Sequence, residues 1–375
     1  GDTALDSVEA GGVSNTAIGS NSGTAITTGD DNTIIGKNAG NAITTGGQNT
    51  ALGSGALFAN TTAASNVAIG TSSMLSTTTG CQNVTLGRDT LRANVTGDLN
   101  TAIGYQTLCK NTVDNNTAVG GCALYANTTG TENVAFGSGA LIANTTGCRN
   151  IAIGYNSLAV NTTGCCNVSI GRTALDANID GDFNTAVGNS ALSENTTADN
   201  NTAVGYLALN ANTTGNSNTA VGVCSLDANT EGDGNSAVGR NALAKNTTAC
   251  YNVAVGYDSL FTNTTGHSNT AVGFNTMCVN TTGDCNVAIG KDALDSNTEG
   301  DCNTAIGTDA LQANTTADYN TAVGSKALFA NTTGHSNVAM GRGSLDANTD
   351  ANQNTAIGTD ALTTATTAGS NTASG

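Results

Sequence analysis

The stretch that decides the fold is residues 133–149, which read NVAFGSGALIANTTGCR. Variants of these seventeen residues follow one another along most of the chain, and we number the positions of each unit from its first asparagine, here Asn133. That asparagine occurs at Asn15, Asn32, Asn49, Asn66, Asn83, Asn100, Asn116 and Asn133, and then at every seventeenth residue to Asn371. Only the step from Asn100 to Asn116 is one residue short. Such a short period predicts a solenoid, in which each coil buries its apolar face against its neighbours.

The composition favours one elongated domain over the two or three globular domains that 375 residues would otherwise suggest. Aromatic residues make up 3% of the chain and Trp is absent, whereas hydrophobic residues reach 38%. This balance suits a narrow core filled by small side chains. The 48 Gly and the absence of Pro fit a coil that turns often and keeps its ladder hydrogen bonds. We expect a continuous solenoid domain over residues 15–375, preceded at 1–14 by a degenerate cap or a processed start.

Within each coil, the pattern predicts two short strands and two turns. At positions 2–4 the side chains alternate, so Ala at position 3 points one way and the larger residue at position 4 points into the core. Leu at position 9 supplies the second core residue, Gly at position 5 permits a bend, and Asn-Thr-Thr-Gly closes the coil. The predicted fold is all-β: a parallel β-solenoid, or two-sided β-roll, of about 21 coils, with its asparagines stacked in an amide ladder. The alternative is a strand plus a single helical turn per coil, as in leucine-rich repeats.

The repeat also resembles a known family. Asn-Val-Ala-Ile-Gly, found at residues 66–70 and 286–290, resembles the head repeat of trimeric autotransporter adhesins. The longer form, Asn-Thr-Ala-Ile-Gly-x-x-Ala-Leu-x-x-Asn-Thr-Thr-Gly, is similar to repeats of bacterial and phage fibre-type surface proteins. The likeness covers nearly the whole chain. It implies a β-solenoid on an extracellular fibre and implies no catalytic residue.

The charge balance argues against two classes of partner. The net charge is −17 and Lys and Arg together number 11, so no basic track exists to follow a phosphate backbone. The same charge disfavours binding to anionic membrane surfaces. No apolar run approaches the 18 residues of a membrane span. We therefore expect neither nucleic-acid binding nor membrane insertion.

Acidic coils recur along the chain from the coil that begins at Asn167 onward. Two of them offer three carboxylates each within seven residues, namely Asp176, Asp180 and Asp182, and Asp227, Glu231 and Asp233. Calcium takes several such oxygen ligands, which makes these residues candidate calcium ligands. The chain lacks the G-G-x-G-x-D pattern of calcium-binding β-rolls. The alternative is a solvated acidic edge that blocks unwanted pairing.

Other deviations from the repeat return every third or fourth coil. Tyrosines directly after the strand glycine, for example, stand at Tyr105, Tyr155, Tyr206 and Tyr257. Lateral packing of solenoids would select such an interval, because twist brings the same face to a neighbour periodically. Duplication of a block of coils would produce the same pattern. Both explanations remain open.

The cysteines indicate disulfides between coils. Cys148 and Cys165 occupy one position on successive coils, as do Cys285 and Cys302, and Cys109 with Cys122 is a weaker third pair. Adjacent coils place such Cα atoms within the range that a disulfide accepts. Isolated buried cysteines are the alternative. No C-x-x-C motif is present, which disfavours a zinc site of standard spacing. Disulfides would place the protein outside a reducing cytosol.

The closing turn also matches the N-glycosylation acceptor sequence. It occurs at Asn60, Asn94, Asn127, Asn144, Asn161, Asn195, Asn212, Asn246, Asn263, Asn280, Asn314 and Asn331. In a secreted eukaryotic protein these turns are expected to be exposed and to carry glycans. The same triplet suits a turn that carries no sugar.

These observations leave three non-enzymatic functions. Neither His267 nor His335 has a local partner pattern for nucleophilic catalysis, and no phosphate-binding or zinc-protease motif is present. We expect an extracellular or cell-surface filament subunit that self-associates end to end and laterally. An adhesin or phage-type fibre that binds surface glycans or host receptors is the alternative. An ice-binding solenoid is suggested by a column of Thr at position 2, but that column shares a face with the Ile and Val that we expect to be buried.

Overall fold

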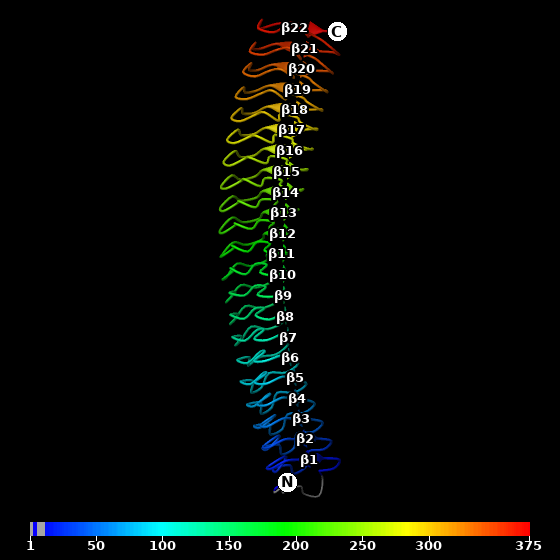
Figure 1. The fold of residues 1–375 in the computed structure, drawn as a ribbon, viewed down its shortest axis with the longest axis vertical. Helices are drawn as coiled ribbons and strands as arrows, with labels where there is room; N and C mark the ends of the chain where they lie inside the picture. Colours follow the sequence, from blue (N-terminus) through cyan, green and yellow to red (C-terminus); the bar gives the residue numbers. More distant parts are fainter. Residues whose placement is uncertain (1–2, 6–11) are drawn as a thin grey trace. The chain divides into compact units, whose positions relative to one another are not determined.

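The computed structural model describes residues 3–5 and 12–375. It confirms the parallel β-solenoid: each coil contributes one strand of three residues, and the part of the chain that is described contains no helix. Accordingly, these residues include no helix that is long and apolar enough to cross a bilayer. The coils divide into two compact units, Gly1–Asn184 and Thr185–Gly375. In each unit the strands follow one another in chain order (Figure 1).

Strands β1 to β10 belong to the first unit. They are β1 (Thr16–Ile18), β2 (Thr33–Ile35), β3 (Thr50–Leu52), β4 (Val67–Ile69), β5 (Val84–Leu86), β6 (Thr101–Ile103), β7 (Thr117–Val119), β8 (Val134–Phe136), β9 (Ile151–Ile153) and β10 (Val168–Ile170). Neighbouring strands pair in parallel, with each residue opposite the same position of the next coil, as Val134 is opposite Ile151. Each column of the sequence repeat is therefore also a column in space.

Strands β11 to β22 belong to the second unit. They are β11 (Thr185–Val187), β12 (Thr202–Val204), β13 (Thr219–Val221), β14 (Ser236–Val238), β15 (Val253–Val255), β16 (Thr270–Val272), β17 (Val287–Ile289), β18 (Thr304–Ile306), β19 (Thr321–Val323), β20 (Val338–Met340), β21 (Thr355–Ile357) and β22 (Thr372–Ser374). Their pairing is parallel and keeps the same register, as Thr202 opposite Thr219 shows.

The second strand predicted for each coil does not form, and neither does a helical turn. Positions 6–11 are a run of turns. The Leu at position 9 adopts a left-handed backbone, as at Leu260, whose φ is 52°. This conformation costs a branched residue roughly 1–2 kcal/mol. It is held because the Leu260 side chain is fully buried and its amide donates a hydrogen bond to the Thr276 carbonyl of the next coil at 2.9 Å.

The interior of the coil is lined by position 3, not by position 4. Ala254 is fully buried, whereas its neighbour Val255 is 37% exposed. The prediction that position 4 fills the core is therefore wrong for Ile103, Val119, Phe136, Ile153 and Ile170. The Leu at position 9 and the asparagines fill the interior, which leaves room for little more than a methyl group on the inner face of the strand.

The coil that begins at Asn32 shows this volume limit directly. Position 3 holds the larger Ile34, which is fully buried. In that coil, position 9 is Gly40 in place of Leu, and a Cβ at Gly40 would lie 2.9 Å from the Ile34 Cδ1 atom. A large residue at position 3 thus fits where position 9 has no side chain. The larger side chain at position 3 occupies the space that the Leu at position 9 fills in other coils, so the core stays filled.

The single short coil loses its residue from the closing turn. In the coil that begins at Asn100, the Val113 carbonyl accepts hydrogen bonds from the Asn100 and Asn111 amides at 2.8 and 2.7 Å. In coils of full length, this role belongs to the residue at position 15, such as Gly147. Because the turn absorbs the deletion, Thr101 still pairs with Thr117 and the sheet register is unchanged.

Candidate functional site

The outward side of the sheet presents the same two positions of the repeat on every coil of each unit. We call the first and third residues of strands β11–β22, which are positions 2 and 4, the sheet face of the second unit. Position 2 is Thr, Ser or Val, and position 4 is Val, Ile or Met except for Ser374. The sheet face therefore carries no charged side chain. Thr hydroxyls line one column and mainly branched aliphatic groups line the other.

The aliphatic column is open to solvent. Val221, Ile289 and Ile357 are 37%, 40% and 48% exposed. The first unit presents the same kind of face, with Leu86 48% and Phe136 57% exposed. Parallel sheets usually have both faces covered, and large exposed apolar patches mark interaction sites. The sheet face is thus the strongest candidate for a functional surface, although the sequence pattern had placed half of it in the core.

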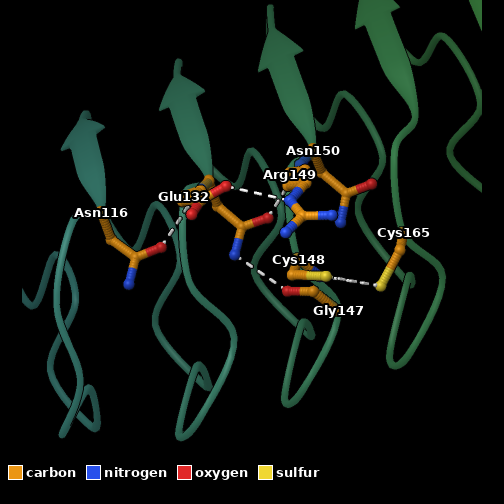
Figure 2. A network of polar contacts seen from close by, with 8 residues as sticks. Asn116, Glu132, Gly147, Cys148, Arg149, Asn150 and Cys165 are labelled. Carbon is orange, nitrogen blue, oxygen red and sulfur yellow. Dashed lines mark hydrogen bonds and ion pairs between the residues drawn. The ribbon is translucent and has the colours of Figure 1, made fainter.

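The asparagine columns are internal scaffolding. At position 12, the Asn144 side-chain amide donates to the side-chain oxygen of Asn127 at 2.8 Å and to the backbone carbonyl of Gly147 at 3.0 Å. At position 1, the backbone amide of Asn150 donates to the Asn133 side-chain oxygen at 3.0 Å, and the Asn133 side-chain amide donates to the Gly147 carbonyl at 2.9 Å. Figure 2 shows part of this network. The predicted amide ladder is confirmed, in two columns instead of one.

The second column contradicts the expectation of exposed glycosylation turns. All twelve acceptor asparagines are fully buried: Asn60, Asn94, Asn127, Asn144, Asn161, Asn195, Asn212, Asn246, Asn263, Asn280, Asn314 and Asn331. The side-chain nitrogen that would carry a sugar points into the coil, where it donates hydrogen bonds. In the folded coil these atoms are out of reach of a modifying enzyme.

Position 16 forms a column of hydrogen-bond acceptors. Its side chain accepts the backbone N–H of position 16 in the preceding coil, as Asp182 does from Cys165, Asp233 from Asn216 and Asp284 from His267, each at 2.6 Å. Histidine takes the same place, since the Nδ1 atom of His267 accepts from the Cys250 amide at 3.0 Å. Acids at this position therefore join adjacent coils.

This geometry corrects the calcium hypothesis. Asp176, Asp180 and Asp182 stand at positions 10, 14 and 16 of one coil, as do Asp227, Glu231 and Asp233 of another. Across residues 3–5 and 12–375, no three or more His, Cys, Asp or Glu side chains gather in a way that could hold a metal ion. Closeness in sequence did not bring the carboxylates together, because the coil turns between positions 10 and 16.

One of these acids makes stability depend on pH. Burial raises the pKa of Asp227, and Lys245 opposes that change. The folded state therefore disfavours the charged carboxylate, and this penalty is present above the raised pKa and disappears as pH falls below the ordinary aspartate pKa. We expect Asp227→Asn to stabilise the coil at neutral pH and to have little effect in acid. Urea unfolding at both pH values measures this. Glu231→Gln, at an exposed acid of the same coil, is the control, and an equal gain at both pH values would contradict the prediction.

Cys148 and Cys165 meet as predicted. Their sulfur atoms lie 3.0 Å apart as free thiols (Figure 2). The Cys148 amide also donates to the Cys165 sulfur at 3.1 Å. The hydrogen bond with Cys165, followed by burial, raises the pKa of the Cys148 thiol to about 11. A disulfide, with an S–S length of about 2.05 Å, needs only a small approach of the two sulfurs.

We expect oxidised glutathione to close this pair faster as pH rises, because the thiolate is the attacking species and Cys148 holds its proton at neutral pH. Alkylation followed by peptide mass spectrometry measures the loss of the two reactive thiols. Cys148→Ser is the matched control, in which Cys165 can lose its reactive thiol only as a mixed disulfide with glutathione, and mass spectrometry distinguishes this product from the bond between Cys148 and Cys165. Two thiols that stay fully alkylated after oxidation in alkali would rule out the bond.

The other two predicted pairs differ in their geometry. Cys285 and Cys302 share position 17 on successive coils; burial raises the pKa of Cys302, and the neighbouring Cys285 adds to the increase. Cys109 and Cys122 occupy positions 10 and 7 of successive coils. Burial raises the pKa of Cys109, and Cys122 contributes least among the causes. Both disulfides remain predictions.

Comparisons with known proteins add no assignment. No protein-family model matches this chain, and no curated protein matches it either.

Proposed function

We propose that this chain is a structural subunit of an extracellular filament or surface appendage and that it self-associates, laterally and end to end. The observation that carries the proposal is the sheet face, an uncharged and solvent-open surface on a parallel sheet. Covering it would remove exposed aliphatic side chains from water. The lateral part of the self-association is assigned to this face.

Two further features support the proposal. The coils are joined by repeated internal bonds, namely two asparagine columns and the acceptor column at position 16. Such redundancy suits a protein that bears load along its length. The facing thiols of Cys148 and Cys165 suit an oxidising environment outside the cell.

Ice binding is a second candidate, and one observation favours it. The sequence argued against it because the Thr column was expected to share a face with buried Ile and Val. Instead, both columns of the sheet face point outward, with Thr at position 2 and Val or Ile at position 4. This gives rows of hydroxyl and methyl groups, in which Val253, Val287 and Val338 interrupt the Thr column. A thermal hysteresis assay on the purified protein tests this candidate, and no activity would remove it.

Sedimentation velocity and negative-stain microscopy over a range of concentrations test self-association. We expect concentration-dependent assemblies that become long filaments; isolated short trimers would instead indicate an adhesin-type fibre. Val255→Lys, on the sheet face, is expected to weaken assembly. Val279→Lys is the matched control, because Val279 is similarly exposed, 39% against 37%, but lies away from the strands. A protein that stays monomeric at all concentrations would overturn the proposal.

A further inference from the structure

We propose that the sheet face of the second unit binds the sheet face of a second copy of this chain, with the two units running in the same direction. This inference rests on the self-association proposed above and specifies its partner and orientation. The argument uses the area of the face, its lack of charge and the unequal charges along its two borders.

The area is sufficient for a specific interface. Twelve strands, β11–β22, spaced about 4.8 Å apart and presenting a width of about 10 Å, offer about 550 Å² per copy. Two copies would bury about 1,100 Å², which is just above the roughly 1,000 Å² expected of a biological interface. Sheets pack face to face about 10 Å apart with interdigitated side chains.

A second copy matches this face better than an unrelated surface does. Any partner must fit two columns of small side chains that repeat at every coil. The side-chain columns of a second copy repeat at the same interval, so side chains that pack well at one coil pack well at every other coil. Because the net charge is −17, two copies repel one another electrostatically. This repulsion is weakest where the uncharged surface of one copy contacts the uncharged surface of the other. The sheet face is such a surface.

The border that precedes the strands is acidic. In the second unit, position 16 contains no Lys or Arg. It holds five aspartates, which are Asp199, Asp233, Asp284, Asp301 and Asp318. Each is only partly buried. Where one oxygen of the carboxylate accepts a backbone amide, as at Asp284, the negative charge remains at the border.

The border that follows the strands carries charges of both signs. Position 6 includes Arg240, Lys291 and Arg342 and has no acid in this unit, whereas the adjacent position 7 contains Asp258, Asp292, Asp309 and Asp360 together with Lys326. The three bases at position 6 are exposed, whereas of the four acids at position 7 only Asp360 is. Lys291, whose side chain is 60% exposed, pairs at 2.8 Å with Asp292, whose side chain is 15% exposed. Protruding positive charge thus lies along this border only.

The two borders decide the orientation of a face-to-face pair. If the two-fold axis runs along the stack of coils, the units point the same way and each acidic border lies opposite the border that carries the bases. If the axis runs along the strands, the units point in opposite directions and the acidic borders face each other. The second arrangement sets five aspartates against five with no cation between them, and like charges placed opposite one another disfavour the contact. The same-direction pair is therefore favoured.

Zero-length carbodiimide crosslinking tests the orientation. Assemblies are made from equal parts of natural-abundance and ¹⁵N-labelled full-length protein, so that mass spectrometry separates links between copies from links within one copy. Asp284 precedes β17 and Lys291 follows it, so in the same-direction pair Lys291 lies opposite Asp284 of the other copy, with Asp301 one coil away. We expect links between copies from Lys291 to these aspartates. Links from Lys291 to Asp292 or Asp309 of the other copy, or no links between copies in assembled protein, would overturn the orientation.

Charge reversal gives an independent test. Arg240→Glu with Arg342→Glu removes two bases of the border and is expected to weaken association about tenfold in sedimentation. Lys110→Glu with Lys245→Glu changes the net charge equally at position 11, which belongs to neither border, and is expected to have a smaller effect. Equal effects of the two pairs, with assemblies still formed, would refute this inference and leave the proposed function standing. Absence of assembly in the unmodified protein would refute both.

Discussion

Replacing Gly290 with Ala is expected to open the solenoid locally, at a cost of about 4 kcal/mol that combines backbone strain with overpacking. Gly290 stands at position 5 with φ at 134°, a conformation that residues with a Cβ rarely adopt. A Cβ there would lie 2.6 Å from the carbonyl oxygen of Gly307, the equivalent glycine of the next coil. Neither backbone can retreat, because each is hydrogen-bonded to its neighbours.

Hydrogen exchange is the appropriate measurement, because a repeat protein responds mainly near the substitution and less in its global melting. Protection should fall in β17 and β18. Gly283→Ala is the control, at position 15: a Cβ there would come equally close to the next coil, 2.5 Å from the Gly300 carbonyl oxygen, but its φ is not positive and other coils accommodate the buried Ala249 and Ala317. Equal protection in the two variants would show that position 5 does not need glycine.

Replacing Asn280 with Asp is expected to cost about 3 kcal/mol or more, because it removes a buried donor and introduces a charge without a partner. The Asn280 amide donates to the Asn263 side-chain oxygen at 2.8 Å and to the Gly283 carbonyl at 3.1 Å. A carboxylate would set oxygen against oxygen at both contacts. Part of the lost stability should be recovered in acid, because a protonated carboxyl can donate one hydrogen bond.

Asn216→Asp makes the same chemical change at an exposed position, where the one donated bond that is lost, from the Asn216 amide to the Thr214 carbonyl at 2.9 Å, can be replaced by water. The Asn216 oxygen accepts from the Asp199 amide at 2.8 Å, and Asp fills this position in the adjacent coils. Thermal unfolding followed by circular dichroism, together with hydrogen exchange in β16 and β17, should separate the two variants clearly. Similar stability for both would mean that the asparagine column at position 12 contributes little.

The sequence pattern did contain a signal for the inward side of the strand. Position 3 is nearly always Ala, Ser or Thr, whereas position 4 varies among Val, Ile, Leu, Phe and Met. A narrow interior tolerates little variation in volume, so the variable column belongs outside and the constant one inside. Hydrophobicity alone suggested the reverse, because larger side chains are usually the buried ones. Because position 4 was assigned to the core, the exposed sheet face was not predicted from the sequence.

Where two coils deviate together, the reason is visible only in space. Ser73 and Thr85 belong to successive coils and are 12 residues apart in the sequence, yet their hydroxyls lie 2.5 Å apart inside the core. Ser157 and Ser169 form the same pair at 2.7 Å. A polar residue at position 3 is thus tolerated because position 8 of the preceding coil supplies its hydrogen-bond partner.

The sequence by itself determined the solenoid, its period, its parallel in-register sheet and the contact between Cys148 and Cys165. The physical reason is that an unbroken repeat places equivalent residues next to one another on adjacent coils. Tertiary structure alone decided that Leu takes a left-handed backbone and that the acceptor asparagines are buried, and it established which side of each strand faces inward, for which the sequence held only the indirect signal of a constant position 3. These choices depend on the volume enclosed by the whole coil and on hydrogen bonds between coils. Local propensity describes neither, so the open face of the sheet emerged only from the folded chain.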